Sequence, residues 1–346
     1  MEKKKLLYEV SYIRPIVIFL LVVSHSFTKI HKGAGDVTQD YDLAIGYLWL
    51  VRLIKGFRIE TIALVAGYVF AYQSIDLKRK YEFWPFVKKK FVRLIIPMLF
   101  FGCIYYFCFF FSPASFSVYG FVNELLSGCG HLWFLPMLFW CFIAIWLIDH
   151  YHLSSKWLLL ILAVFSIAPP LNLPFGFNRL PHFLFFVYAG YFLWEHHDVV
   201  MSRANGKWIA LAWVVYVLLV VIKSTVIPSY KAADTALSKV FLFGVNNCMH
   251  LITSCCGIMA LYLTVVHFTN RDGFTPPPWV INASNDCYGV YVFHQFILIW
   301  LYFYTPLVAV CPPLLVPLVG FAVALSTSLL LTKLMLKTRF GRFLIG

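Results

Sequence analysis

The feature that most constrains this chain is a succession of ten long apolar runs separated by short polar segments. The runs cover residues 11–30, 43–74, 91–112, 131–149, 156–174, 181–195, 207–227, 238–268, 279–304 and 310–336. An α-helix needs about 20 apolar residues to cross a bilayer, so most of these runs are long enough to span a membrane. We therefore expect an all-α fold, a polytopic transmembrane helical bundle of about ten spans.

Two of the runs are too long for one straight span. The run 43–74 contains Gly56 and several charges around it, so we expect a short outer helix followed by a span over residues 57–74. The run 238–268 contains the polar pair Asn246-Asn247, and we expect an interruption near it.

Composition and charge agree with a membrane protein. Of the 346 residues, 61% are hydrophobic and 12% charged, whereas a soluble domain is about half apolar and a quarter charged. The net charge of +13 would suggest nucleic acid as a partner of a soluble protein. Membrane proteins, however, concentrate lysine and arginine in their cytoplasmic loops, so we expect no nucleic-acid partner.

The placement of the positive charges predicts an orientation. If the N-terminus is cytoplasmic, the inner segments carry most of the lysines and arginines, and residues 76–90 are the most basic of them. We therefore expect the N-terminus and the C-terminus to be cytoplasmic. The nine cysteines include no C-x-x-C pair, so they signal neither a zinc site nor a redox motif. We expect no bound metal and no tightly bound cofactor.

Arg14 and His25 are the most informative ionisable pair, because they share the first apolar run. Eleven helical steps are about three turns, which places both side chains on one face, roughly 16 Å apart along the axis. Ionisable groups inside a membrane indicate function by default. Arg14 suits a phosphate-bearing ligand, and His25 suits a general base. The alternatives are an arginine that snorkels to the headgroups and a histidine bonded to a backbone carbonyl.

Arg58 and Glu60 open the second span. They are predicted at a depth comparable to His25, where Glu60 would orient His25 or bind an acceptor hydroxyl. Residues two apart do not face each other on a helix, so we expect the two to serve different partners. The alternatives are an interfacial charge cluster and a structural ion pair with other helices.

Two further segments carry aromatic and imidazole side chains. His131 and Trp133 enter the fourth span beside two glycines and can form a platform for a sugar ring; the alternative is an interfacial anchor. In the ninth span, Tyr288 and Tyr291 lie three residues apart, as do Tyr291 and His294. A polar stripe of this kind faces the interior of the bundle, where the alternative role is hydrogen bonding between helices.

The basic run 78–93 ends in three consecutive lysines and Arg93. Positive-inside bias and contact with anionic lipid explain such a run without any ligand. The functional alternative is that Lys90 and Arg93 collect an anionic cytosolic ligand such as coenzyme A.

Five of these segments, in their order along the chain, resemble one known family. They are Arg14-x10-His25, Ala66-Gly67-Tyr68, Lys90-x-x-Arg93-x-x-x-Pro97, His131-Leu132-Trp133-Phe134-Leu135 and Tyr288-Gly289-Val290-Tyr291-Val292-Phe293-His294. The set is similar to the membrane-bound acyltransferase-3 family, which acylates cell-surface glycans in bacteria. The resemblance covers nearly the whole chain. It implies residues 1–346 as one transmembrane acyltransferase domain, with no soluble extracellular domain.

The resemblance also implies site residues. His25 becomes the catalytic base, whereas Glu60 joins the catalytic site from the reasoning on the second span alone. Arg14 and Arg58 bind the donor or form its site, and the charge of the basic run adds Lys90 and Arg93 to the donor-binding set. The acceptor-binding set is His131, Trp133, Tyr288, Tyr291 and His294. The second span departs from the family pattern, with Ala66 in place of a serine and Glu60 where a proline is common.

The leading hypothesis is an acyl-CoA-dependent O-acyltransferase, most simply an O-acetyltransferase, in the bacterial cytoplasmic (inner) membrane. Acyl-CoA is its co-substrate, a glycan or lipid-linked saccharide its acceptor, and membrane lipid its surroundings. The rival hypothesis is a glycan exporter or transporter without acyl transfer. A third is a non-catalytic partner in glycan synthesis. The sequence favours the enzyme because a base and a phosphate-binding cation share one helix.

Overall fold

The computed structural model describes residues 7–28, 45–169, 173–227 and 235–346, and these residues form helices and no strands. The α-helices are α1 Tyr8–Ser26, α2 Ile45–Lys55, α3 Arg58–Ala71, α4 Phe83–Lys90, α5 Ile96–Phe109, α6 Val118–Ser127, α7 Phe134–His150, α8 Lys156–Ile167, α9 Leu180–Glu195, α10 His197–Met201, α11 Gly206–Thr225, α12 Ala236–Thr269, α13 Pro278–Tyr304, α14 Leu307–Val310, α15 Val316–Lys337 and α16 Arg339–Ile345. Two π-helical turns, η1 Tyr72–Asp76 and η2 Phe91–Ile95, and two 3₁₀ turns, η3 Pro113–Ser115 and η4 Gly130–Trp133, complete them. The predicted all-α transmembrane class is confirmed.

Every predicted apolar run contains a helix of the bundle. Seven of the described helices are long and apolar enough to cross a membrane. They are Tyr8–Ser26, Phe83–Phe109, Gly130–His150, Gly206–Thr225, Ala236–Thr269, Pro278–Tyr304 and Val316–Lys337. The helices of the other three runs, α3, α8 and α9, are shorter. Ten spans and cytoplasmic termini therefore stay predictions.

The two overlong runs behave differently. The first divides as predicted, because α2 ends at Lys55 and α3 begins at Arg58. The predicted interruption near Asn246-Asn247 is wrong, because α12 continues through both residues. Their amides bond without breaking the helix. Asn246 donates to the carbonyl of Leu242 at 2.8 Å, and Asn247 donates to that of Ile167 at 3.2 Å.

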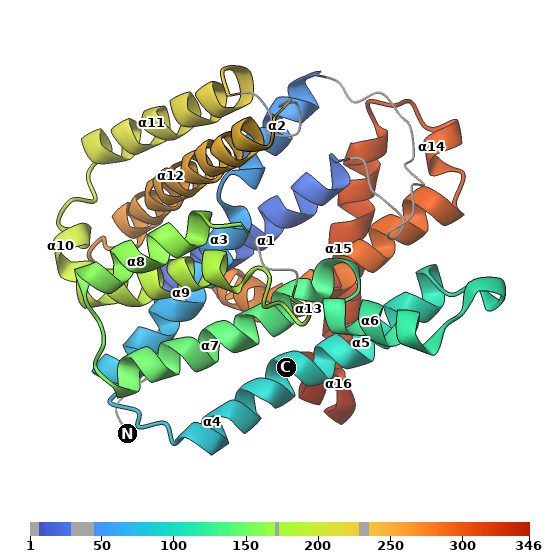
Figure 1. Ribbon diagram of the computed structural model, residues 1–346, viewed down its shortest axis with the longest axis horizontal. Helices are drawn as coiled ribbons and strands as arrows, with labels where there is room; N and C mark the ends of the chain where they lie inside the picture. The colour runs from blue at the N-terminus through green and yellow to red at the C-terminus, as the bar shows by residue number, and fades with distance from the viewer. Residues whose placement is uncertain (1–6, 29–44, 170–172, 228–234) are drawn as a thin grey trace.

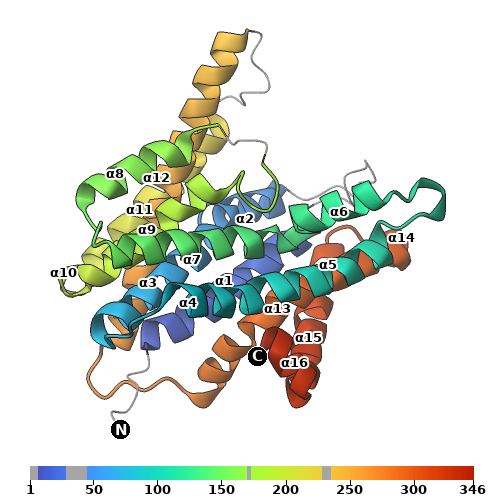
Figure 2. The same cartoon turned by 60° about the horizontal axis from the view of Figure 1, so that its bottom comes forward.

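Helix α1 lies in the centre of the bundle, in contact with α3, α12, α13 and α15. Figures 1 and 2 show α4 and α5 as one nearly continuous rod on one side, while α11 and α12 run side by side on another. The C-terminal helices α13 and α15, coloured orange to red in Figure 1, pack against each other. The side chains of α1 thus point into a space enclosed by helices from both ends of the chain.

Helices α3 and α9 pack unusually closely. A β-carbon on Gly67 would lie 1.7 Å from the carbonyl oxygen of Val187, and one on Gly190 would lie 1.9 Å from that of Leu64. Both distances are impossible, so only glycine fits at either position. Small residues of this kind let membrane helices approach each other without a clash. The contact fixes the second half of α3 against α9.

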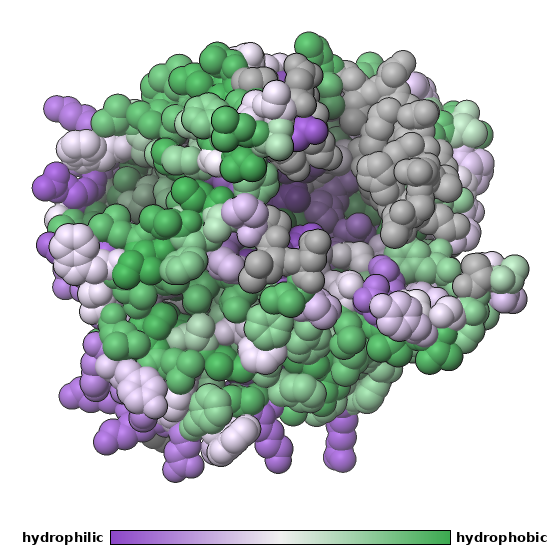
Figure 3. Space-filling model, viewed as in Figure 1, coloured by the Kyte–Doolittle hydropathy of each residue, from purple (hydrophilic) through white to green (hydrophobic). Residues whose placement is uncertain are grey.

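The outer surface matches a lipid environment. Figure 3 shows apolar side chains over most of this face, polar side chains at its edges, and a polar recess between α12 and α15. Helix α11 turns Leu211, Val214 and Leu218 outward. Because lipid tails are as apolar as these side chains, such exposure is ordinary for a membrane helix.

Candidate functional site

His25 has a specific partner on another helix. Its Nδ1 atom lies 3.1 Å from Nε2 of His294 on α13, and the ring centroids are 5.1 Å apart. His294 is fully buried, whereas His25 is only partly buried. The C-terminal end of α1 therefore holds an imidazole that is fixed on one side and accessible on the other.

The backbone determines which nitrogen of each ring carries a hydrogen. Nδ1 of His294 lies 2.7 Å from the carbonyl oxygen of Tyr291, which can only accept, so Nδ1–H donates to it. In a neutral His294, Nε2 then accepts, and His25 donates to it from its own Nδ1–H. Nε2 of His25 is left with its lone pair. This is the form of imidazole that removes a proton from a hydroxyl.

His131 supplies a third ring beside this pair. Its centroid lies 5.1 Å from that of His294, and its Nε2 lies 3.0 Å from the carbonyl oxygen of Val292. The hydroxyl of Tyr291 donates to the carbonyl of His131 at 2.6 Å. These bonds attach η4 to α13. We call His25, His131 and His294 the base cluster.

A cavity of about 800 Å³ is lined by Tyr291, whose ring lies 5.5 Å from that of His131, although none of the three histidines of the base cluster lines it. Its cationic lining side chains are Arg14, Lys89, Lys90, Arg93 and Arg342, and no aspartate or glutamate side chain lines it in the described part of the chain. Cations from α1, α4, η2 and α16 thus face one space without a side-chain counter-ion. We call it the basic cavity.

Aromatic rings hold two of these cations in place. The guanidinium of Arg93 lies 4.7 Å from the ring centre of Tyr288, whose hydroxyl donates to the carbonyl of Arg93 at 3.1 Å. The guanidinium also donates to a main-chain oxygen of Gly346. The ammonium of Lys90 lies 3.3 Å from the ring centre of Phe142. Cation–π contacts of this kind orient a charge without neutralising it.

Tyr291 joins the two regions. Its side chain lines the basic cavity, its hydroxyl bonds to the backbone of His131, and its carbonyl fixes the proton of His294. Three predicted donor-binding residues, Arg14, Lys90 and Arg93, are therefore gathered in one cavity, and a predicted acceptor residue separates them from the base cluster.

Comparison with known families agrees with this arrangement. The family model of an acyltransferase domain, acyltransferase-3, matches residues 7–333, nearly the whole chain. The chain belongs to the acyltransferase-3 family. With its apolar helices it is an integral membrane acyltransferase. Neither a curated protein nor a solved structure matches it.

The structure places the other predicted site residues of this acyltransferase as follows. Arg58 is buried, and its Nε and Nη1 atoms have no hydrogen-bond partner in the described ranges. It does not line the basic cavity, but its charge acts on both His25 and Glu60. Glu60 contacts His182 and His250. The two residues therefore have different surroundings, as their spacing predicts.

The indole ring of Trp133 stacks against the side chain of an arginine. The guanidinium of Arg179 lies 3.6 Å from the centre of its ring. Arg179 follows a turn at Gly176, just before α9 begins. Sequence reasoning overlooked Arg179, because a single arginine in a loop between two spans carries no pattern.

Sequence reasoning also overlooked Lys89 and Arg342 in the cavity, and His182 and His250 beside Glu60. Arg342 lies on α16, beyond the last predicted run, so only the fold brings it to α4. For the two histidines a signal was present, since each is an ionisable residue inside an apolar run.

Proposed function

We propose that this membrane acyltransferase is an O-acyltransferase of the bacterial cytoplasmic membrane. It moves an acyl group, most simply acetyl, from cytosolic acyl-CoA to a hydroxyl of a cell-surface or lipid-linked glycan. One observation carries the proposal. Five cations and no carboxylate side chain of the described residues line the basic cavity. Tyr291 also lines it, and the carbonyl of Tyr291 fixes the tautomer of His294, the partner of His25.

The basic cavity suits the donor. Coenzyme A carries several phosphate groups, and arginine offers a planar fork of donors that matches phosphate oxygens. Arg14 and Arg93 would hold these phosphates, with Lys90 beside them. A volume of about 800 Å³ lies within the range of pockets for ligands of this kind. The apolar part of the lining, which includes Val65 and Leu138, would accept the pantetheine arm.

His25 would act as the general base. Nε2 of His25 takes the proton of the acceptor hydroxyl while that oxygen attacks the thioester carbonyl. A carbon–oxygen bond forms, and the tetrahedral intermediate collapses as the carbon–sulfur bond breaks. The thiolate of coenzyme A leaves and takes the proton from the His25 imidazolium. His294 holds the ring of His25 throughout and is a positioning residue.

Arg58 would stabilise the negative charge that develops on the carbonyl oxygen. A buried guanidinium with two unpartnered nitrogens, close enough to act on His25, offers fixed donors for that charge. Such preorganised donors stabilise a transition state because they need no rearrangement.

Direct transfer is favoured over a covalent acyl-enzyme. The serines that flank His25 are both engaged, because Ser24 donates to the carbonyl of Leu21 at 3.2 Å and Ser26 donates to that of Val22 at 2.8 Å. For the acceptor, Trp133 with Arg179 and the rings of the base cluster would form the binding surface.

A transfer assay tests this function. Purified protein in detergent is incubated with radiolabelled acetyl-CoA and surface-glycan fractions, and the label in glycan is counted for wild type and His25→Ala. We expect transfer by wild type and its loss in the variant, with coenzyme A still bound by both. Transfer that is unaffected by His25→Ala would exclude His25 as the base. A wild type that exports glycan but binds no coenzyme A would make the protein an exporter.

A further inference from the structure

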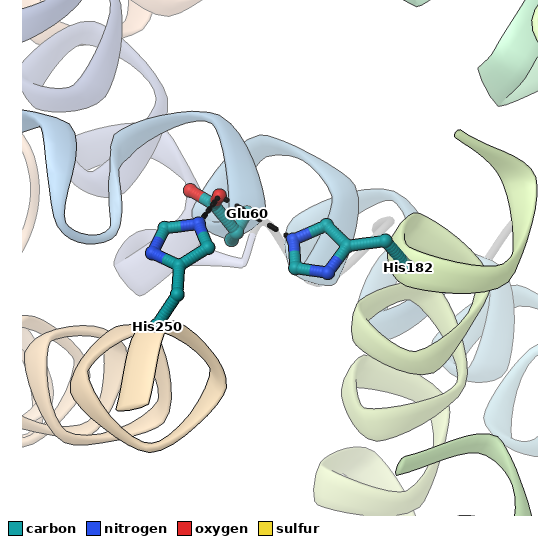
Figure 4. Close-up of side chains that lie close together, drawn as sticks. All are labelled: Glu60, His182 and His250. Carbon is teal, nitrogen blue, oxygen red and sulfur yellow. Dashed lines mark hydrogen bonds and ion pairs between the residues drawn. The ribbon is translucent and has the colours of Figure 1, made fainter. Parts of the chain in front are cut away.

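A second cluster of ionisable side chains lies inside the bundle. Figure 4 shows Glu60, His182 and His250 pointing toward one another from three different helices. Glu60 belongs to the first turn of α3, His182 to the first turn of α9, and His250 to the middle of α12. None of the three lines the basic cavity. We call this group the carboxylate cluster.

The distances in the carboxylate cluster match those between the ligands of a metal ion. Nε2 of His250 lies 3.1 Å from Oε1 of Glu60, and Nε2 of His182 lies 3.6 Å from the same oxygen. One ligand-type atom from each residue lies within 4.8 Å of the other two. Zinc binds nitrogen and oxygen at about 2.0–2.2 Å, so ligands at the corners of a tetrahedron lie about 3.3 Å apart. The observed distances lie on either side of that value.

The surroundings of His182 favour a cation between its ring and Glu60. Nδ1 of His182 lies 3.4 Å from the carbonyl oxygen of Ser166, which can only accept a hydrogen, and 3.5 Å from the hydroxyl of Ser166, which can donate or accept one. When Nδ1–H donates to the carbonyl, the shorter of the two contacts, a neutral His182 directs the lone pair of Nε2 at Oε1 of Glu60, which also carries lone pairs. At 3.6 Å the contact is too long for a hydrogen bond. Histidines that bind metals commonly donate their other ring nitrogen to a backbone carbonyl, as here.

No arginine or lysine of the described residues forms an ion pair with Glu60, although the charge of Arg58 acts on it from beyond contact distance. Its side chain is buried, its ion-pair partners there are the two histidines alone, and Oε2 has no hydrogen-bond partner. A buried carboxylate is strongly unfavourable unless a positive charge lies beside it. Beside Glu60, where Arg58 makes no ion pair, a proton on one imidazole or a bound cation supplies that charge.

We propose that Glu60, His182 and His250 bind a divalent transition-metal ion, with zinc the best match. Two imidazoles and one carboxylate suit zinc and its first-row neighbours, whereas magnesium and calcium prefer oxygen ligands alone. Three protein ligands leave a fourth position for water or a further ligand. The ion would join α3, α9 and α12, and so fix the first turn of α3, where Arg58 also lies.

Metal analysis of the purified protein tests the proposal. The protein is prepared without a polyhistidine tag, dialysed, and exposed to zinc in detergent, and bound metal is measured by mass spectrometry. Glu60→Gln, His182→Gln and His250→Gln each remove one ligand. His197→Gln is the matched control, because Nε2 of His197 lies 3.1 Å from the carboxylate of Asp198 without a second histidine. Cobalt loading gives an independent readout, since tetrahedral cobalt absorbs visible light intensely.

We expect one metal ion per chain in wild type and in His197→Gln. Substitutions of residues around a metal's ligands commonly lower metal affinity by roughly 10–100-fold. Because each of the three variants removes a ligand itself, its zinc affinity should fall by more than that. The proposal is overturned if wild type binds no zinc or cobalt, which would leave a hydrogen-bonded cluster with a protonated histidine. It is overturned equally if the three variants bind metal as wild type does. Size-exclusion profiles identify any variant that fails to fold, and the remaining variants then decide.

Discussion

The base cluster and the carboxylate cluster both contain histidines inside the helical bundle. They differ chemically because the carboxylate cluster also contains Glu60. In the base cluster, the carbonyls of Tyr291 and Val292 fix the ring hydrogens of His294 and His131, His294 in turn fixes that of His25, and no carboxylate of the described residues takes part. In the carboxylate cluster, Glu60 lies between two imidazoles. The first arrangement leaves a neutral nitrogen free to accept a proton, whereas the second requires a positive charge. Burial alone therefore does not assign a role to a histidine in this bundle.

The largest expected effect separates the clusters directly. His25→Ala should lower the transfer rate by about 10²–10⁴, the usual contribution of a general base, while bound metal is retained. His250→Ala should lose the metal. Initial rates of label transfer and metal content, measured on the same samples, check both. Loss of metal in His25→Ala would mean that the two clusters are one site.

A second prediction concerns the contact between His294 and His25. His294→Gln should lower kcat by about 100-fold. Without the contact from His294, the ring of His25 shifts relative to the acceptor hydroxyl, and a shift of about 1 Å is enough for such a loss. The double variant with His25→Ala should be no slower than His25→Ala alone, since His294 acts through His25. Steady-state rates of the two single variants and the double variant decide. Additive losses would give His294 an independent role.

Substitutions that remove a positive charge from the basic cavity should weaken coenzyme A binding without changing either cluster. Arg93→Gln and Arg14→Gln should each weaken coenzyme A binding by about tenfold, as expected for the loss of one charge-assisted hydrogen bond. Lys88→Gln is the matched control, because Lys88 is exposed and does not line the cavity. Titration calorimetry at two salt concentrations measures the affinities. An equal loss in the control would point to general surface charge instead of the cavity.

The smallest effect tests the packing of α3 against α9, the helices that carry Glu60 and His182. Gly67→Ala should destabilise the bundle by about 1–3 kcal/mol, because its β-carbon meets the backbone of Val187. Gly244→Ala on α12 has open space around the new β-carbon and should stabilise the helix by about 0.5–1 kcal/mol. Thermal unfolding in detergent compares the two. If Gly67→Ala unfolds at the same temperature as wild type, then α3 and α9 pack less closely than described.

The comparison also explains what could be predicted from the sequence. The apolar runs predicted the helices, because a membrane-spanning helix requires about 20 consecutive apolar residues, which can be seen directly in the sequence. Arg14 and His25 could be found for the same reason, since they are charged or polar exceptions on one helix. The predicted break in α12 failed because the sequence does not reveal that Asn247 finds a carbonyl on α8.

The carboxylate cluster could not be predicted, because its members are far apart in the chain. Glu60 was predicted to act with His25, but the described contacts of Glu60 are with His182 and His250, and His25 contacts His294 instead. The expectation of no metal rested on cysteine spacing, which says nothing about histidines on separate helices. Tertiary packing alone brings α3, α9 and α12 to one point.

The central claim is that one region holds the charge of the donor while another removes the proton of the acceptor. The most direct test is the steady-state kinetics of acetyl transfer with varied acetyl-CoA for wild type, Arg93→Gln and His25→Ala. The account predicts that Arg93→Gln raises KM by about tenfold with kcat near wild type. It predicts that His25→Ala lowers kcat by at least about 100-fold with KM unchanged. A kcat in His25→Ala equal to that of wild type, or the same constant altered in both variants, would contradict it.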